Sequence, residues 1–147
     1  VYSANNKGNL ALLLSFIRSG MPLPNITNKN RRSIVSIDNL TDFIIICLGH
    51  KAVSNKVLFV SDGKDASTNE LICLMAKSCG KEPNFIPHFG IILQLLLKIF
   101  MQRNLIQKLF GSLQIDIKNT QRLTGWNPPY TTEECFKKYY SGGRFDA

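Results

Sequence analysis

Apolar residues recur with helical spacing over several stretches of the chain, and most of these stretches carry recognisable helix ends. A leucine and isoleucine stripe covers residues 10–18, between Asn9, which can cap a helix, and Gly20, which can end it. Residues 67–70 and 131–134 are capping boxes, in which a hydroxyl and a glutamate satisfy each other's backbone amides. The pattern predicts helices over residues 10–18, 38–48, 67–80, 90–101, 116–125 and 131–142.

Two other stretches have patterns typical of strands. Residues 33–37 alternate polar and apolar side chains, and residues 56–61 form an apolar run that leads to a turn at Asp62-Gly63, as in an interior strand. Residues 21–24 are expected to be extended because proline disfavours helix in the residue before it, and 113–115 form a short extended piece. With no repeat or linker, residues 1–147 are expected to form a single domain of the α+β class, rich in helices with a few short strands.

The helix predicted over residues 38–48 has an unusual pattern. Asp38 stands where a cap is expected, and the residues from Leu40 to Leu48 are apolar nearly all round the helix. We therefore expect this helix to be buried between layers.

Composition adds that the chain needs no covalent reinforcement. A chain of 147 residues, 44% of them hydrophobic, can bury a core without disulfides. The four cysteines, Cys47, Cys73, Cys79 and Cys135, lie in apolar or helical surroundings. The simplest interpretation is that they are buried, reduced thiols of a cytosolic protein.

Charge points to an anionic ligand more than to a polyanion. The chain has 18 Lys and Arg against 10 Asp and Glu, but only residues 29–32 form a dense basic run, and no aromatic residues alternate with it. Nucleic-acid binding is therefore disfavoured. The apolar stretch 91–100 contains Gln94 and Lys98 and is too short to span a membrane, and the first residues carry no export signal. We expect a cytoplasmic protein without a membrane partner.

The sequence contains no self-contained catalytic constellation. His50 and His88 have no potential metal ligands at suitable spacing, and the glycine-rich nucleotide loops are absent. Asn9 at a helix start and Arg31 and Arg32 beside a predicted strand suit an anion, although each alone is more simply a cap or a solvated charge.

The order of several short motifs changes this picture. The motifs are Val-Tyr and Gly-Asn-Leu within residues 1–10, an arginine, a strand pattern and Asp-Asn-Leu in 32–40, Val-Ser-Asp-Gly with Ser-Thr-Asn-Glu-Leu in 60–71, Gly-Ser-Leu-Gln-Ile-Asp in 111–116 and Leu-Thr-Gly-Trp-Asn-Pro-Pro in 123–129. In this order they resemble segments of the extended short-chain dehydrogenase/reductases of the NAD-dependent epimerase/dehydratase family: Val-Tyr-Gly-Pro-x-x-x-Gly-Asn-Leu, an arginine, a strand and Asp-Asn-Leu, Val-Ser-Asp-Gly with Ser-Thr-x-Glu-Leu, Gly-Ser-Leu-x-Val-Asp, and Leu-Gly-Trp-x-Pro. Each motif is weak alone, and five in order are specific.

The resemblance covers only the second half of such an enzyme. The family's glycine-rich dinucleotide loop belongs to the first half, and no tyrosine of this chain has a lysine four residues later, so the Tyr-x-x-x-Lys pair is absent too. The resemblance implies a helix-rich, C-terminal substrate lobe of a Rossmann-type enzyme, with the NAD-binding domain missing. It implies that Val1 and Tyr2 border the cofactor in the full-length enzyme, and that this chain alone binds no NAD and is inactive.

The resemblance also implies a ligand and the residues that hold it. In a lobe that binds a UDP-sugar, Asn9 would contact the diphosphate at its helix start, and Leu23 and Pro24 would pack near the uracil. Arg32 would pair with phosphate or ribose, and Lys108 would stand at the family's second phosphate-binding arginine.

The full-length enzyme would be a 4-epimerase that supplies sugars for polysaccharides. A reductase or dehydratase of UDP-4-keto-6-deoxyhexosamines is the alternative within the family, and a basic module that binds nucleic acid or a protein partner is the alternative of another class. Exposed strand edges favour a homodimer.

Overall fold

The computed structural model describes residues 1–5, 9–25, 29–86 and 111–141. In this part of the chain the fold is rich in helices and has two very short strands, so the helix-rich α+β expectation is confirmed at this level. The α-helices are α1 (Asn9–Ser19), α2 (Ile37–Gly49), α3 (Thr68–Ser78), α6 (Lys118–Thr124) and α7 (Thr132–Tyr140), with a 3-10 turn, η1, at Lys51–Val53. None of the described helices is both long and apolar enough to cross a bilayer.

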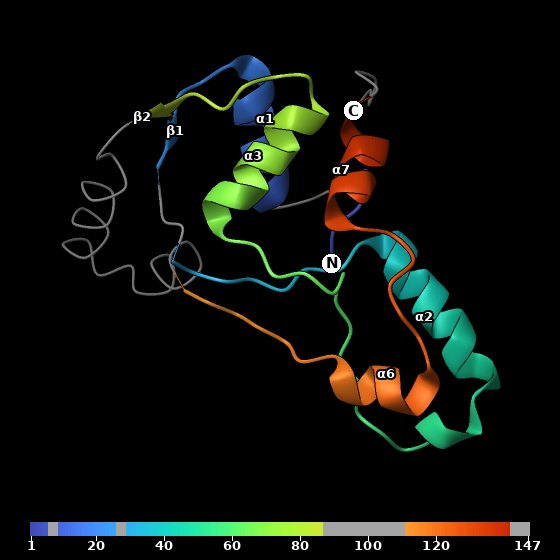
Figure 1. Cartoon of the computed structure of the whole chain (residues 1–147). Helices are drawn as coiled ribbons and strands as arrows, with labels where there is room; N and C mark the ends of the chain where they lie inside the picture. Colours follow the sequence, from blue (N-terminus) through green and yellow to red (C-terminus); the bar gives the residue numbers. More distant parts are fainter. Residues whose placement is uncertain (6–8, 26–28, 87–110, 142–147) are drawn as a thin grey trace.

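Helix α3 lies at the centre of the packing. It contacts α1 on one side and α7 on the other, while α2 begins beside α7 and extends away from this trio, and η1 contacts α6 (Figure 1). The side chains of Ile72, Met75 and Phe136 are fully buried, and the ring of Tyr2 meets that of Phe136 at a centroid distance of 4.8 Å. Because these side chains come from the chain start, α3 and α7, the core joins elements that are distant in sequence.

Local signals determine where several helices begin and end. Both predicted capping boxes are confirmed: Ser67 and Glu70 start α3, and Thr131 and Glu134 start α7. Gly125 ends α6 with φ of 68°, a left-handed conformation that favours glycine.

The strands are shorter than predicted. Leu23–Pro24 (β1) pairs in parallel with Phe85–Ile86 (β2), which confirms the extended Pro-Leu-Pro segment. The predicted strands at residues 33–37 and 56–61 are wrong: the first contributes one isolated bridge, from Ser36 to Tyr2, and the second forms no ladder. Backbone hydrogen bonds join residues 31–37 to Tyr2, Asp62, Ala66 and Leu113, but within the described part of the chain they form isolated bridges and no continuous ladder. Among the described residues, no backbone hydrogen bond uses the amides of 57–60.

The prediction for α2 needs two corrections. Its N-cap is Ser36, whose hydroxyl accepts from the amide of Asn39, rather than Asp38. The helix is not buried between layers either, since Ile45 is 63% exposed and Leu48 is 84% exposed. Helical periodicity identified the helix but could not show what covers it.

Other expectations met mixed outcomes. All four cysteines are free, as expected, but only Cys135 is buried, and Cys73 is exposed. The helix predicted over residues 90–101 lies outside the described residues.

Replacement of Gly125 by alanine tests the positive φ. Nothing lies within 4 Å of the added Cβ, so the cost is conformational, and we expect Gly125→Ala to lower the free energy of unfolding by about 1 kcal/mol. Gly49→Ala is the matched control, because Gly49 also faces open space and its φ is not positive. Urea denaturation of both variants measures the difference, and equal effects would contradict this explanation.

The ion pair between α7 and α2 predicts a pH dependence. Lys138 Nζ lies 2.6 Å from Asp38 Oδ2, and this contact lowers the pKa of Asp38 below its ordinary value. Because its pKa is lower in the folded state, the ionised Asp38 carboxylate stabilises the fold at pH values above the unfolded-state pKa of about 4. This contribution is lost as the pH falls through the folded-state pKa. We therefore expect the wild-type advantage over Asp38→Asn to be present at neutral pH and to vanish in acid.

Urea denaturation between neutral pH and pH 2 measures this advantage. Glu82→Gln, at an exposed position, is the control and should run parallel to wild type. A constant difference between wild type and Asp38→Asn across the acid range would refute the role of the pair.

Candidate functional site

A buried carboxylate, Asp62, joins the elements around the site. Asp62 is 6% exposed and follows directly on the predicted strand at 56–61. One oxygen accepts from the backbone N–H of Ser36 at 2.9 Å and from Asn39 Nδ2 at 2.7 Å. The other accepts from the hydroxyls of Tyr2 at 2.6 Å and Thr132 at 3.1 Å. These four donors hold the chain start, the beginning of α2 and the beginning of α7 in fixed relation.

Tyr2, one of the two residues predicted to border a cofactor, is 1% exposed. Burial, followed by the contacts with Asp62, raises the pKa of its phenol far above the ordinary value, so the hydroxyl stays protonated and donates to Asp62. Its partner in that prediction, Val1, is 74% exposed. The structure therefore uses the Tyr2 side chain in the core, and any border with a cofactor would involve Val1 or the backbone.

Asparagine and arginine side chains surround the start of α3. Asn30, which is 4% exposed, donates from Nδ2 to Thr68 Oγ1 at 2.7 Å and accepts from the Thr68 amide at 3.1 Å. Asn69 donates to Asn25 Oδ1, and Arg31 Nη1 lies 3.0 Å from Glu70 Oε2. The segments 23–25 and 30–32 are thus both attached to one helix end, which sequence reasoning missed because these contacts join residues about forty positions apart.

The predicted ligand-binding residues fall partly within this region. Leu23 is 2% exposed and pairs with Phe85, with Pro24 next to it in β1. Arg32 is half-buried, its backbone bridges Ala66 and Leu113, and burial lowers the pKa of its guanidinium. A guanidinium remains charged despite such a shift, so Arg32 offers a half-buried cation on a segment whose backbone pairs with Ala66, next to the start of α3.

The structure says less about the other two predicted ligand-binding residues, Asn9 and Lys108. Asn9 is the first residue of α1, the helix that packs on α3, so the helix start itself is confirmed. Lys108 lies outside the described residues. The structure therefore places Leu23, Pro24 and Arg32 on segments that are hydrogen-bonded to the start of α3. Asn9 is located only as the first residue of α1, the helix that packs on α3.

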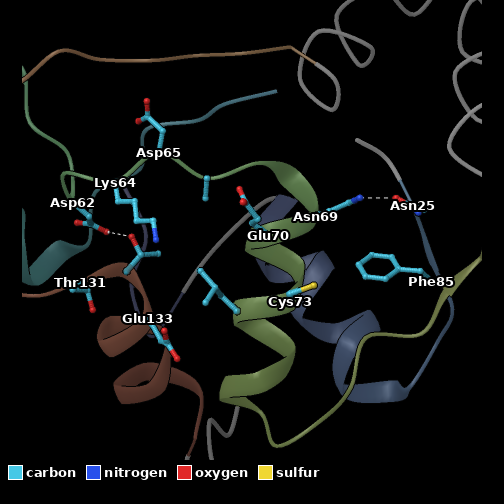
Figure 2. Close-up of a pocket in the computed structure, with 13 residues that line it drawn as sticks. Asn25, Asp62, Lys64, Asp65, Asn69, Glu70, Cys73, Phe85, Thr131 and Glu133 are labelled. Atoms are coloured by element: carbon cyan, nitrogen blue, oxygen red, sulfur yellow. Dashed lines mark hydrogen bonds between the residues drawn. The ribbon is translucent and has the colours of Figure 1, made fainter. Parts of the chain in front are cut away.

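A cavity of about 610 Å³ lies on the exposed side of α3 (Figure 2). Asn69 and Cys73 of α3 line it, with Phe85 on one side and Glu133 of α7 on the other (Figure 2). Of the predicted ligand-binding residues whose side chains the structure describes, neither Leu23 nor Arg32 lines this cavity.

The charges of the cavity do not suit a phosphate. Its charged lining consists of Asp62, Asp65, Glu70 and Glu133 against a single lysine, Lys64. The amide of Ser67 lowers the pKa of Glu70, and the hydrogen bond from Lys77 lowers that of Glu133, so both stay ionised. Within the described ranges, no group of three or more His, Cys, Asp or Glu side chains could hold a metal ion.

Comparison with known proteins gives one strong sequence match. No protein-family model matches the chain. Over 140 residues it is 39% identical to UDP-glucose 4-epimerase from Vibrio cholerae, in a match that covers 94% of this chain and 42% of that protein. The chain thus spans less than half the length of this relative.

The fold is similar to parts of two epimerases of known structure. UDP-glucose 4-epimerase from Thermotoga maritima, crystallised with UDP-glucose, matches with a TM-score of 0.62 at 18% identity over 92% of this chain and 40% of that chain. UDP-glucuronic acid 4-epimerase from Bacillus cereus, in complex with NAD, matches with a TM-score of 0.59 at 17% identity over 87% of this chain and 35% of that chain. At such identities the likeness concerns the fold.

Replacement of Asp62 by asparagine tests whether this carboxylate organises the site. The amide nitrogen of asparagine is a donor, and it would replace a carboxylate oxygen that accepts hydrogen bonds from hydroxyl or amide groups. Two donors would then face each other, so we expect a loss of about 2–4 kcal/mol in the free energy of unfolding. Asp65→Asn is the control: Asp65 is less buried and accepts from Ser33 and Gln114, and its replacement should cost less than about 1 kcal/mol. Equal losses in the two variants, measured by urea denaturation, would show that Asp62 has no special role.

Proposed function

We propose that this chain is the UDP-hexose-binding part of a sugar-nucleotide 4-epimerase. The premise is its similarity to the NAD-dependent epimerase/dehydratase family, which the match to UDP-glucose 4-epimerase supports. The observation that carries the proposal is 39% identity over 140 residues. The complete enzyme would supply sugar precursors for polysaccharides, and the match to a 4-epimerase favours this reaction over the reductase or dehydratase alternative.

The geometry supports a nucleotide diphosphate near the start of α3. Arg32 provides a half-buried cation, and α1 begins at Asn9, where the partial positive charge of a helix start favours an anion. The diphosphate carries about two negative charges, which such groups stabilise by charge-assisted hydrogen bonds. We assign Leu23 and Pro24 of β1 to the uracil and keep Lys108 as a second phosphate contact.

This assignment separates the nucleotide from the cavity beside Cys73. The cavity has four carboxylates in its lining, and at least Glu70 and Glu133 repel a diphosphate. The proposed ligand therefore lies on the side of the α3 start that Asn30 and Arg32 occupy, away from Glu133.

NAD enters the proposal only through the complete enzyme. The side chain of Tyr2 is not available to a dinucleotide, because it is enclosed in the core and its hydroxyl donates to Asp62. We assign NAD binding and the catalytic Tyr-x-x-x-Lys pair to the part of the enzyme outside the matched region, and we expect this chain alone to convert no UDP-sugar. A homodimer and a cytoplasmic location also stay predictions.

The nucleic-acid alternative has less support. Part of the basic run at residues 29–32 is neutralised locally, because Arg31 pairs with Glu70 at 3.0 Å. A basic surface for a polyanion needs several cations free of such neighbours.

Isothermal titration with UDP and UDP-glucose tests the proposed function. We expect wild type to bind both ligands and Arg32→Ala to bind about tenfold or more weakly, a change of about 1.4 kcal/mol, because a charge-assisted contact to phosphate is lost. Arg31→Ala is the matched control, since its side chain is exposed and already paired with Glu70.

Two results would overturn the proposal. One is the absence of heat with either ligand for a sample whose circular dichroism shows the folded state. The other is an equal loss of affinity in Arg31→Ala and Arg32→Ala.

A further inference from the structure

The carboxamide of Asn30 joins three segments that are far apart in the sequence. Nδ2 donates to Thr68 Oγ1 at 2.7 Å and to the carbonyl oxygen of Gly111 at 3.4 Å, while Oδ1 accepts from the Thr68 amide at 3.1 Å. These partners lie 38 and 81 positions away along the chain, and Asn30 is only 4% exposed. A buried carboxamide with both ends satisfied holds its neighbours in a defined arrangement.

The residues that follow Asn30 lie between the same two segments. The amide of Arg32 donates to the carbonyl of Ala66 at 2.9 Å, and the amide of Ser33 donates to the carbonyl of Leu113 at 2.8 Å. Asn30 stands at the end of this pairing, two residues before Arg32. A change at the Asn30 side chain therefore acts on the backbone that carries the Arg32 guanidinium.

The start of α3 is already occupied by the chain itself. The Ser67 hydroxyl accepts from the amide of Glu70 at 3.1 Å, and the Glu70 carboxylate accepts from the amide of Ser67 at 2.6 Å. Asn30 takes the amide of Thr68 in the same way. A diphosphate beside this helix start therefore depends on the Arg32 guanidinium, because these three amides are engaged.

We propose that Asn30 is a positioning residue of the nucleotide site. It holds the segment that carries Arg32 against α3 and residues 111–113, and it thereby directs the guanidinium toward the diphosphate without touching the ligand. The proposal rests on the proposed function and adds to it a residue that acts through Arg32.

The chemistry of asparagine suits this position. An apolar side chain of similar size would leave the Thr68 amide and the Gly111 carbonyl without the contacts that Asn30 supplies. Aspartate would keep the acceptor for the Thr68 amide, but it would lose both donations and add a negative charge near a diphosphate. Asparagine alone of these three provides an acceptor and two donors without charge.

Isothermal titration of wild type and Asn30→Ala with UDP and with uridine tests the proposal. We expect Asn30→Ala to bind UDP about fivefold or more weakly, because Arg32 meets the diphosphate in a poorer geometry. Uridine has no phosphate, so its affinity should change by less than about twofold. A merely structural role would not separate the two ligands.

A double-mutant cycle shows whether Asn30 acts through Arg32. In the Arg32→Ala background the guanidinium is gone, so adding Asn30→Ala should change the UDP affinity by less than about twofold. A fivefold effect that persists in this background would overturn the proposal, since Asn30 would then act without Arg32.

A pair of threonine variants keeps the test available if Asn30→Ala fails to fold. Thr68→Val removes the hydroxyl that accepts from Asn30 and leaves the Ser67 and Glu70 cap in place, so UDP should bind about twofold or more weakly. Thr120→Val is the matched control. Thr120 is 2% exposed on α6, and its hydroxyl donates to the carbonyl of Phe59 at 2.8 Å, so this variant also loses a buried hydrogen bond but should leave the UDP affinity unchanged.

The outcomes separate this proposal from the proposed function. Equal losses for UDP and uridine in Asn30→Ala, or equal effects of Thr68→Val and Thr120→Val, would overturn the role of Asn30. So would unchanged UDP affinity in a folded Asn30→Ala sample, and the proposed function would then stand. Absence of UDP binding by folded wild type would overturn the proposed function and the role of Asn30 together.

Discussion

The carboxylate of Asp62 is the group on which the arrangement of this fold depends. A buried charge is tolerated only when its lone pairs are satisfied, and Asp62 receives donors from Tyr2, Ser36, Asn39 and Thr132. These donors come from the chain start, the start of α2 and the start of α7. The carboxylate thereby determines how three separate elements approach α3 and the core around Phe136.

The region beside α3 follows from this arrangement. With Tyr2 and Thr132 held at Asp62, α7 packs along α3, and the strand-like segments 30–36 and 61–66 run side by side between them. Arg32 is placed by the backbone bridges of that pair of segments, and Asn30 attaches it to the α3 start. The proposed nucleotide site therefore depends on backbone pairing and helix capping, which hold the segment that carries Arg32.

Local features of this fold could be predicted from the sequence, and non-local ones could not. The capping boxes at Ser67 and Thr131 and the helix stop at Gly125 involve neighbours within four residues, so the chain itself specifies them. Side-chain alternation at 33–37 and an apolar run at 56–61 predict strands, but a strand also needs continuous backbone pairing with distant segments, and the described residues form only isolated bridges at 33–37 and no ladder at 56–61.

The same limit applies to α2 and to the site. Apolar residues nearly all round α2 predict a buried helix, but the sequence does not reveal which element, if any, covers each face. The sequence around Asp62 indicates only a turn, because its four donors lie up to 70 positions away and no local pattern reveals them. The motif resemblance supplied Leu23, Pro24 and Arg32 as a set, whereas the asparagines that attach their segments to α3 have no motif of their own.

The most direct measurement of the central claim is a map of the backbone amide resonances of this chain during titration with UDP. The account predicts that the signals of Leu23, Arg32, Ser67 and Thr68 shift with UDP concentration, while those of Cys73 and Glu133 beside the acidic cavity stay in place. Shifts confined to Cys73, Glu133 and their neighbours, with Leu23 and Arg32 unchanged, would contradict it.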